Sequence, residues 1–330
     1  MATFSATFSQ SFMIPRPVLT EKNLPDQTGK VHIVTGGYSG VGKELAAILY
    51  QRNATVYVAG RSEAKATTAI KAIKDQYPHS TGRLAFLSVD FSDLATVKPA
   101  VESFLAQEKQ LHVLVNNAGI MVPPKGSKGK QGHELQMATN CLGPFLFTKS
   151  LVPVLKETAA VSPPGSVRIT WASSLASSAL SPQGGVSLGK DGAPVVSSTQ
   201  WVNYGQSKAA GIFYASEFSR RYGSHGILSV SFNPGNLKSD LHRHLDLLST
   251  LAAKIFSHPV RYGAYTELYS GWSPDIQPEN GGMFVIPWGR EGNSTLRGDL
   301  RKSVEESRTD ETSVVRRFWD WSESETAQYA

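Results

Sequence analysis

Tyr204 and Lys208 lie four residues apart, and their side chains are suited to moving a proton. Residues at this spacing share one face of a helix, so a phenol and an ammonium can act together there. A free tyrosine has a pKa of about 10, too high for efficient acid and base work at neutral pH, and a nearby ammonium favours the phenolate. We therefore expect Lys208 to lower the pKa of Tyr204. The same pair also arises by coincidence on many helices, so the pattern needs support elsewhere in the chain.

A glycine-rich turn upstream is suited to holding the pyrophosphate of a dinucleotide. The segment from Thr35 to Gly42 reads TGGYSGVG and directly follows a short apolar run. Gly36, Gly40 and Gly42 allow a sharp turn and a close approach to phosphate, whose charge the N-terminus of the next helix stabilises. Glycines at this spacing also fit an ordinary tight turn. Their position between an apolar strand and an amphipathic helix favours the dinucleotide.

The residue after the second expected strand indicates which dinucleotide binds. NAD sites place an acidic residue there for the ribose 2′-OH, whereas this chain has Arg61, followed by Ser62. A guanidinium binds a phosphate bidentately, so we predict NADP(H) as the cofactor, with the Ser62 hydroxyl as a further donor. The alternative is that Arg61 only begins the next helix. Asp90, after the third expected strand, is expected near the adenine, or else serves as a cap or turn aspartate.

Apolar strands alternating with helices must position these side chains. The expected strands are Val31–Val34, Thr55–Ala59, Leu84–Val89, Leu111–Val115, Ser166–Ala172 and Ile227–Phe232. Helices are expected over 42–52 and 63–76, the second stopped by Pro78. The alternation predicts an α/β fold: a single-domain, Rossmann-like, doubly wound parallel sheet with helices on both faces.

Three segments interrupt this alternation. Residues 1–28 are expected to form an N-terminal arm on the surface of a main domain that spans 29–290. Residues 175–203 form an insert rich in glycine and serine, which suggests a mobile flap at the mouth of a substrate site. Residues 289–312 are expected to be loop-like. The C-terminal extension, 291–330, is expected to pack on the same domain.

Two further helices are expected near the end of the chain. The last one begins near Thr312 and has Val315, Phe318 and Trp319 on one side. The other, from Leu241 to Phe256, repeats apolar residues at helical spacing within a segment of about 236–258. It is expected to be an apolar lid over the substrate, and the alternatives are plain core packing and shallow insertion at a membrane surface.

The bulk composition fits a cytoplasmic enzyme of one domain. The chain has 330 residues and a single cysteine, Cys141, which excludes an internal disulfide and fits a reducing compartment. No secretory signal and no run of about 18 apolar residues is visible, so no transmembrane segment is expected. The net charge of +6 fits either an anionic ligand or an ordinary basic surface. No metal is expected, because His242 and His244 would diverge on a helix, and no lysine cluster has the interleaved aromatics of a nucleic-acid site.

With these motifs in this order, the chain resembles the short-chain dehydrogenase/reductase family over residues 30–290. The matching positions are the glycine turn, Asp90, Asn116 to Gly119, Asn140, Ser174, Tyr204, Lys208, and Pro234 with Gly235. Within the family, the long insert and Arg61 resemble retinol-dehydrogenase-like and fungal secondary-metabolite reductases.

The resemblance implies roles for particular residues. Tyr204 is the acid and base, Lys208 also holds the nicotinamide ribose, Ser174 binds the substrate oxygen, and Asn140 anchors a water that relays protons. Ser174 is preferred over Ser173 because the second serine of the pair is usually the reactive one. The implied cofactor contacts are Gly36, Ser39, Gly40, Val41, Gly42, Arg61, Asp90, Asn117, Ala118, Gly119, Tyr204, Lys208, Pro234, Gly235, Leu237 and Ser239.

The function expected from these features is NADP(H)-dependent interconversion of a carbonyl and an alcohol on a mid-sized, apolar molecule. Two alternatives stay open: reduction of an activated carbon–carbon double bond by the same residues, and a non-catalytic regulator that binds a dinucleotide. The expected partner is a small-molecule substrate, without nucleic acid. A peripheral membrane contact and a homodimer are compatible with the sequence.

Overall fold

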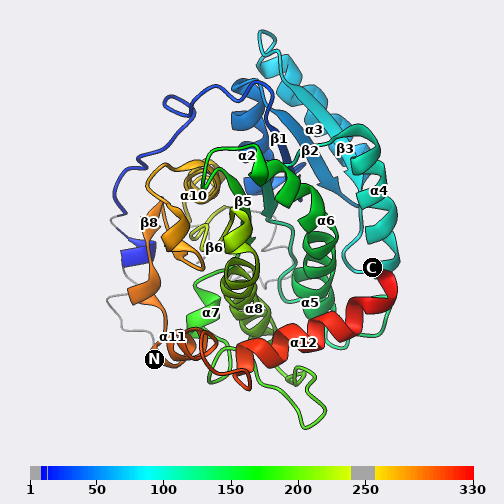
Figure 1. The fold of residues 1–330 in the computed structure, drawn as a ribbon, viewed down its shortest axis with the longest axis vertical. Coiled ribbons are helices and arrows are strands. Elements are labelled where there is room, and N and C mark those ends of the chain that lie inside the picture. Colours follow the sequence, from blue (N-terminus) through cyan, green and yellow to red (C-terminus); the bar gives the residue numbers. More distant parts are fainter. Residues whose placement is uncertain (1–8, 13, 239–256) are drawn as a thin grey trace.

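A computed structural model describes residues 9–12, 14–238 and 257–330, which build an eight-stranded sheet in the order β3-β2-β1-β4-β5-β6-β7-β8 (Figure 1). Neighbouring strands from β3 to β7 pair in parallel, and β8 pairs with β7 antiparallel. The strands are β1 (Val31–Thr35), β2 (Thr55–Gly60), β3 (Arg83–Ser88), β4 (Val113–Asn116), β5 (Val167–Ala172), β6 (Ile227–Phe232), β7 (Phe284–Ile286) and β8 (Arg290–Glu291). The predicted doubly wound sheet is therefore confirmed, with one antiparallel strand at its edge.

Helices cover both faces of the sheet, and a hydrophobic core lies under each layer. One face carries α2 (Gly40–Gln51), α3 (Glu63–Gln76) and α10 (Val260–Trp272). The other carries α4 (Val97–Gln107), α6 (Gly143–Ala160) and α8 (Gln200–Tyr222), with α11 (Gly298–Glu306) and α12 (Val314–Thr326) packed outside them. Two short helices, α5 (Leu135–Met137) and α7 (Ala176–Ala179), flank the site described below. None of the described helices is both long and apolar enough to cross a membrane.

The final helix, α12, lies across α6 and α8 (Figure 1). Its Val315, Phe318 and Trp319 are each at most 1% exposed, which confirms the predicted apolar side. The Trp319 ring meets Phe145 of α6 and Phe218 of α8 edge to face, at centroid distances of 4.9 and 4.8 Å. Aromatic pairs of this geometry stabilise a contact beyond the area that they bury.

The stretch from 289 to 312 is not the loop that we expected. It contains β8, a 3-10 turn at Asn293–Thr295 and the helix α11. Only Leu300 and Ser303 of α11 are buried, so the apolar stripe of this helix is too narrow to be recognised in the sequence.

The order of the strands reverses between β1 and β4, because the chain first builds outward to β3 and then returns to the other side of β1. In doubly wound sheets, ligands bind at this switch point, beyond the carboxyl ends of the strands. The glycine turn after β1, Arg61 after β2 and Asn117 after β4 all lie at that edge.

Candidate active site

The glycine turn connects β1 to α2, and its backbone favours glycine at three positions. Gly36 and Gly40 have φ angles of +66° and +52°, in the left-handed region that favours glycine. A Cβ at Gly42 would lie 2.8 Å from the carbonyl oxygen of Gly36 and 2.6 Å from Nδ2 of Asn117. Because α2 begins at Gly40, the amides of its first turn are available to an anion.

Asn117 fixes this turn against the end of β4. Its Nδ2 donates to the carbonyl oxygen of Thr35 at 2.8 Å. The Thr35 hydroxyl in turn donates to the carbonyl of Val115 and accepts from the amide of Ala118, at 3.1 and 2.9 Å. These bonds tie the two strand ends on either side of the switch point into one rigid floor.

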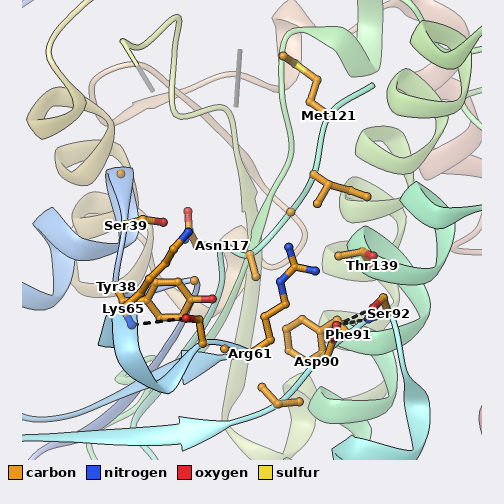
Figure 2. A pocket seen from close by; sticks show the side chains of 18 of the residues that line it. Tyr38, Ser39, Arg61, Lys65, Asp90, Phe91, Ser92, Asn117, Met121 and Thr139 are labelled. Atoms are coloured by element: carbon orange, nitrogen blue, oxygen red, sulfur yellow. Dashed lines mark hydrogen bonds between the residues drawn. The ribbon is translucent and has the colours of Figure 1, made fainter. Parts of the chain in front are cut away.

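A cavity of about 380 Å³ opens above this floor and carries two cations from the β2–α3 side. Figure 2 shows Arg61 extending into its middle and Lys65 beside Tyr38. Of the predicted cofactor residues, the cavity is lined by Gly36, Ser39, Gly40, Val41, Arg61, Asp90, Asn117, Ala118 and Gly119. Gly42 is buried beneath it. Lys65 was missed by the sequence reasoning, although its position in the first turn of α3, four residues after Arg61, was a usable signal.

Tyr38 and Asp90 shape the two walls of the cavity. A Cβ at Gly60 would lie 2.9 Å from the Tyr38 hydroxyl, so the ring of Tyr38 takes the space of any side chain there. Oδ1 of Asp90 accepts from the amide and the hydroxyl of Ser92 at 2.9 and 2.7 Å. Asp90 therefore lines the cavity and also forms the turn that we considered as its alternative role. Ser62 caps α3 by accepting from the Lys65 amide at 3.4 Å.

Ser174 and Tyr204 meet beside the carboxyl end of β5. Tyr204 lies in the second turn of α8 and is 6% exposed, and its hydroxyl lies near the Ser174 side chain. The Ser174 hydroxyl also accepts from the amide of Ala176 at 3.2 Å, at the start of α7. Ser173 instead donates to the carbonyl of Lys208 at 2.8 Å and is 2% exposed. The geometry therefore favours Ser174 over Ser173 as the serine that faces a substrate.

Lys208 lies one helical turn after Tyr204, with its Nζ 5.8 Å from the centroid of the tyrosine ring. That Nζ donates to the carbonyl of Ala172 at 3.0 Å. A Cβ at Gly119 would lie 3.3 Å from Nζ and 3.2 Å from Oδ1 of Asn140. Any side chain at Gly119 would crowd both groups, so the backbone after β4 passes directly beside them.

Asn140 lies in a π-helical turn, Ala138–Leu142, between α5 and α6. Its side chain is fully engaged: Oδ1 accepts from the Ile120 amide, and Nδ2 donates to the Ile120 carbonyl and the Ser207 hydroxyl, at 2.8 to 3.0 Å. π-turns inside helices are frequent at functional sites. The side chain therefore holds the segment at Ile120, which follows β4, in place.

The pKa of Tyr204 is the reverse of our expectation. Burial raises the pKa of Tyr204 to about 12, and the nearby Ser174 side chain offsets only part of that rise. Burial also lowers the pKa of Lys208 to about 8, because an ammonium loses hydration there. Desolvation therefore dominates the pKa of both groups. In the protein without ligand, Tyr204 is held as the neutral phenol.

The turn after β6 carries the remaining predicted cofactor contacts. Gly235 has a φ of +93°, and a Cβ there would lie 2.8 Å from the indole of Trp288. Pro234 is half-buried, whereas Leu237 is 5% exposed and forms an isolated parallel bridge with His258. Ser239 and the helix expected from Leu241 to Phe256 lie outside the described residues.

The insert is fastened at its base, which argues against the flap that we expected. The Arg297 guanidinium donates to the carbonyls of Ser178, Ser181 and Pro182 at 2.5 to 3.0 Å. Further along, the Gln206 side chain accepts from the amide of Ser187 and donates to the carbonyl of Val195. Both halves of the insert are thus attached to α8 or to the segment before α11.

Comparison with known proteins gives consistent matches. A family model described as short chain dehydrogenase matches residues 30–183. A short-chain dehydrogenase/reductase of Phomopsis amygdali is 42% identical over 323 residues, covering 95% of this chain and 94% of that protein. The short-chain dehydrogenase/reductase bet4 of Neocamarosporium betae is 40% identical, covering 98% and 94%.

Two solved structures share the fold. A protein of Mycobacterium paratuberculosis is 25% identical with a TM-score of 0.64, covering 94% of this chain and 97% of that one. An NADPH-bound carbonyl reductase from chicken fatty liver is 22% identical with a TM-score of 0.60, covering 82% and 95%.

Proposed function

Because the chain belongs to the short-chain dehydrogenase/reductase family, we propose that it is an NADP(H)-dependent oxidoreductase that interconverts a carbonyl and an alcohol. The observation that carries this proposal is the convergence of Ser174, Tyr204, Lys208 and Asn140 at the carboxyl edge of the sheet, beside Gly119. A neutral acid, a hydrogen-bond donor for an oxygen and a buried ammonium are the groups that carbonyl reduction requires.

The residues that line the cavity fit a phosphorylated dinucleotide. The left-handed glycines and the first turn of α2 form a cradle for a pyrophosphate, and Arg61, Ser62 and Lys65 supply donors for a 2′-phosphate. The space for an acidic side chain at Gly60 is taken by Tyr38, which argues against an NAD-type ribose contact at that position. The NADPH found in the related carbonyl reductase is consistent with this assignment.

In the proposed reaction, the cofactor, when bound, supplies the hydride to the carbonyl carbon. Tyr204 holds the proton that the carbonyl oxygen takes up, and its raised pKa keeps that proton in place before reaction. The Ser174 hydroxyl, which lies near Tyr204, orients the same oxygen. Lys208 provides a positive charge that stabilises the phenolate left behind, and Asn140 holds the segment at Ile120 against α8.

The cavity lining that follows Gly119 in the sequence is apolar, which favours an apolar substrate. Ile120, Met121, Pro123 and Leu135 line the end of the cavity. A mid-sized ketone or aldehyde with an apolar body fits this lining, because burial of apolar surface stabilises binding at about 25 cal/mol per Å². A role in secondary metabolism stays a prediction from the family resemblance.

The proposal is tested by following NADPH absorbance with a panel of apolar ketones and aldehydes, with enones included in the panel. We expect NADPH-dependent turnover of carbonyl compounds, with the alcohol identified by mass spectrometry. The same panel with NADH serves as the control for cofactor choice. Reduction of only the enone double bond would replace the proposed reaction, and the absence of any turnover with NADPH bound would favour a non-catalytic dinucleotide-binding protein.

A further inference from the structure

A short N-terminal segment, residues 9–12, lies against the turn that follows β6. Figure 1 shows it in blue beside β8 and away from β1. Gln10 and Ser11 are only 3% and 5% exposed, although polar side chains are usually exposed. Their polar atoms must therefore bond to the protein.

The partners of this segment lie on both sides of the Pro234–Gly235 turn. Nδ2 of Asn233 donates to Oε1 of Gln10 at 2.9 Å, and Nδ2 of Asn236 donates to the Ser11 hydroxyl at 3.1 Å. Nε2 of His258 donates to the Ser11 carbonyl at 3.3 Å. The two asparagines that bracket the turn are thus bonded to adjacent residues of the arm.

The edge hairpin holds the same segment from the other side. Arg290 of β8 donates to the carbonyl of Ser9 at 2.8 Å, and Nε2 of Gln10 donates to the Thr295 hydroxyl at 3.2 Å. Trp288, in the connection between β7 and β8, packs against Gly235 and meets the His258 ring at a centroid distance of 5.0 Å. The turn is therefore enclosed between the arm and an indole.

The enclosed turn is connected to the cofactor cradle. Backbone bonds of 3.0 and 2.8 Å join Lys238 and Asn236 to His258, and they place Leu237 beneath α10. A Cβ at Gly263 of α10 would collide with Leu237 and come within 3.1 Å of Val41, which belongs to the glycine turn. A displacement of the turn after β6 would therefore be transmitted to the first turn of α2.

We infer that residues 9–12 form a clasp that positions the Asn233–Leu237 turn for cofactor and substrate binding, with Gln10 and Ser11 as positioning residues. The inference rests on the proposed function, because it assigns the turn to the same site. The arm is attached a second time further along the chain, where Glu21 pairs with Arg261 of α10 at 3.3 Å and Arg261 pairs with Glu44 of α2 at 3.0 Å. The N-terminal arm is therefore attached at two places, by residues 9–12 to the turn after β6 and by Glu21 to Arg261.

The test compares a truncation that lacks residues 1–12 with one that lacks only residues 1–8, which keeps the clasp. A Gln10→Ala/Ser11→Ala double variant repeats the test without shortening the chain. Asp26→Ala is the matched control, because it removes an exposed contact of the same arm with Asn53. NADPH affinity is measured by intrinsic fluorescence, steady-state kinetics by NADPH absorbance, and backbone exposure of residues 233–238 by hydrogen exchange.

We expect the 1–12 truncation and the double variant to weaken NADPH binding and to raise KM roughly tenfold, with a smaller change in kcat. Exchange at 233–238 should become faster, while the 1–8 truncation and Asp26→Ala behave as the wild type. Unchanged exchange and affinity would overturn the inference. Unfolding of the double variant beside a stable control would also overturn it, since the segment would then be purely structural. The exchange measurement needs no substrate, so it decides the clasp even if no carbonyl compound is reduced.

Discussion

Two cationic side chains that line the cavity are expected to determine the preference for NADPH over NADH. Arg61 and Lys65 line the same wall, and both are exposed. A charge-assisted hydrogen bond stabilises a complex by about 1.5–3 kcal/mol, so Arg61→Asp should reduce the preference for NADPH over NADH by roughly 10- to 150-fold. Lys65→Ala should reduce it less, because a lysine acts as a point charge.

Lys71→Ala, on the same helix but paired with Asp75 at the surface, is the matched control for this titration. The two cofactors are titrated by intrinsic fluorescence. Equal affinity of the wild type for NADPH and NADH would contradict the assignment of Arg61.

The pKa of Lys208 sets an expected pH dependence. Burial lowers it from 10.5 to about 8, so the ammonium is present below that pH and lost above it. Since the ammonium stabilises the phenolate formed in reduction, kcat/KM for carbonyl reduction should be level below about pH 8 and fall as the pH rises further. Lys208→Arg, which stays charged, should remove the fall even if its rate is lower. A wild-type profile that stays level well into the alkaline range would contradict this role.

The first half of the insert between β5 and α8 is held by one arginine, Arg297, which lies just before α11. Removing the Arg297 guanidinium leaves several carbonyls of the insert without donors, and each such loss costs about 1–3 kcal/mol. Arg297→Ala should therefore lower the free energy of unfolding by at least about 3 kcal/mol and speed proteolysis of residues 178–187. Denaturant titration and limited proteolysis measure the two effects.

Arg301→Ala, an exposed residue of α11, is the control for that substitution. The hydrogen bond from Arg297 lowers the pKa of Asp299 from 3.8 to about 2, so the contribution of this pair is complete above about pH 4 and lost as the pH falls toward 2. An insert that resists protease equally in Arg297→Ala and wild type would show that Arg297 does not hold it.

The sequence predicted the six longer strands of the sheet, whereas the helices α4, α6 and α10 and the two short strands were not predicted individually. The six expected strands are all present, because buried parallel strands appear as continuous apolar runs. The strands β7 and β8 have three and two residues, too few for any periodicity. The segments around Tyr204 and Gly36 were found because their residue types and spacing determine their chemistry.

Two features of the site could not be predicted from the sequence. The engagement of the Asn140 side chain depends on a π-turn, which no local pattern indicates. The raised pKa of Tyr204 depends on burial, a tertiary property that the spacing of Tyr204 and Lys208 does not contain. The clasp likewise joins Gln10 to Asn233, more than 200 residues apart.

Two buried histidines at the opposite edge of the sheet make the stability of the protein dependent on pH. Burial lowers the pKa of His112 from 6.5 to about 4, and burial with the charges of His112 and Lys30 lowers that of His32 as well. The unfolded chain binds more protons in this interval, so stability should fall as the pH drops from about 6.5 to about 4 and level off below.

His112 alone corresponds to about 3 kcal/mol over that interval. His112→Gln should flatten the slope of Tm against pH, while His79→Gln, at an exposed position, leaves it unchanged. A slope that is the same in His112→Gln and in wild type would contradict the assignment.

The chain consists of an N-terminal arm, a main sheet domain and a C-terminal extension. We propose that all three parts contribute to shaping one active site. The arm contacts the turn after β6, and α12 covers α6 and α8. The described contacts of both ends run to elements that carry site residues, which supports a shared role for the whole chain in shaping the site.

We propose that the Tyr204 hydroxyl supplies the proton for carbonyl reduction, and Tyr204→Phe tests this. The substitution keeps the buried ring and removes the hydroxyl, so NADPH affinity and Tm should stay close to wild type. The rate of NADPH oxidation in a single turnover with a reducible ketone should fall at least about a hundredfold. A Tyr204→Phe protein that binds NADPH and reduces the ketone at a near-normal rate would contradict the account, because another group would then supply the proton.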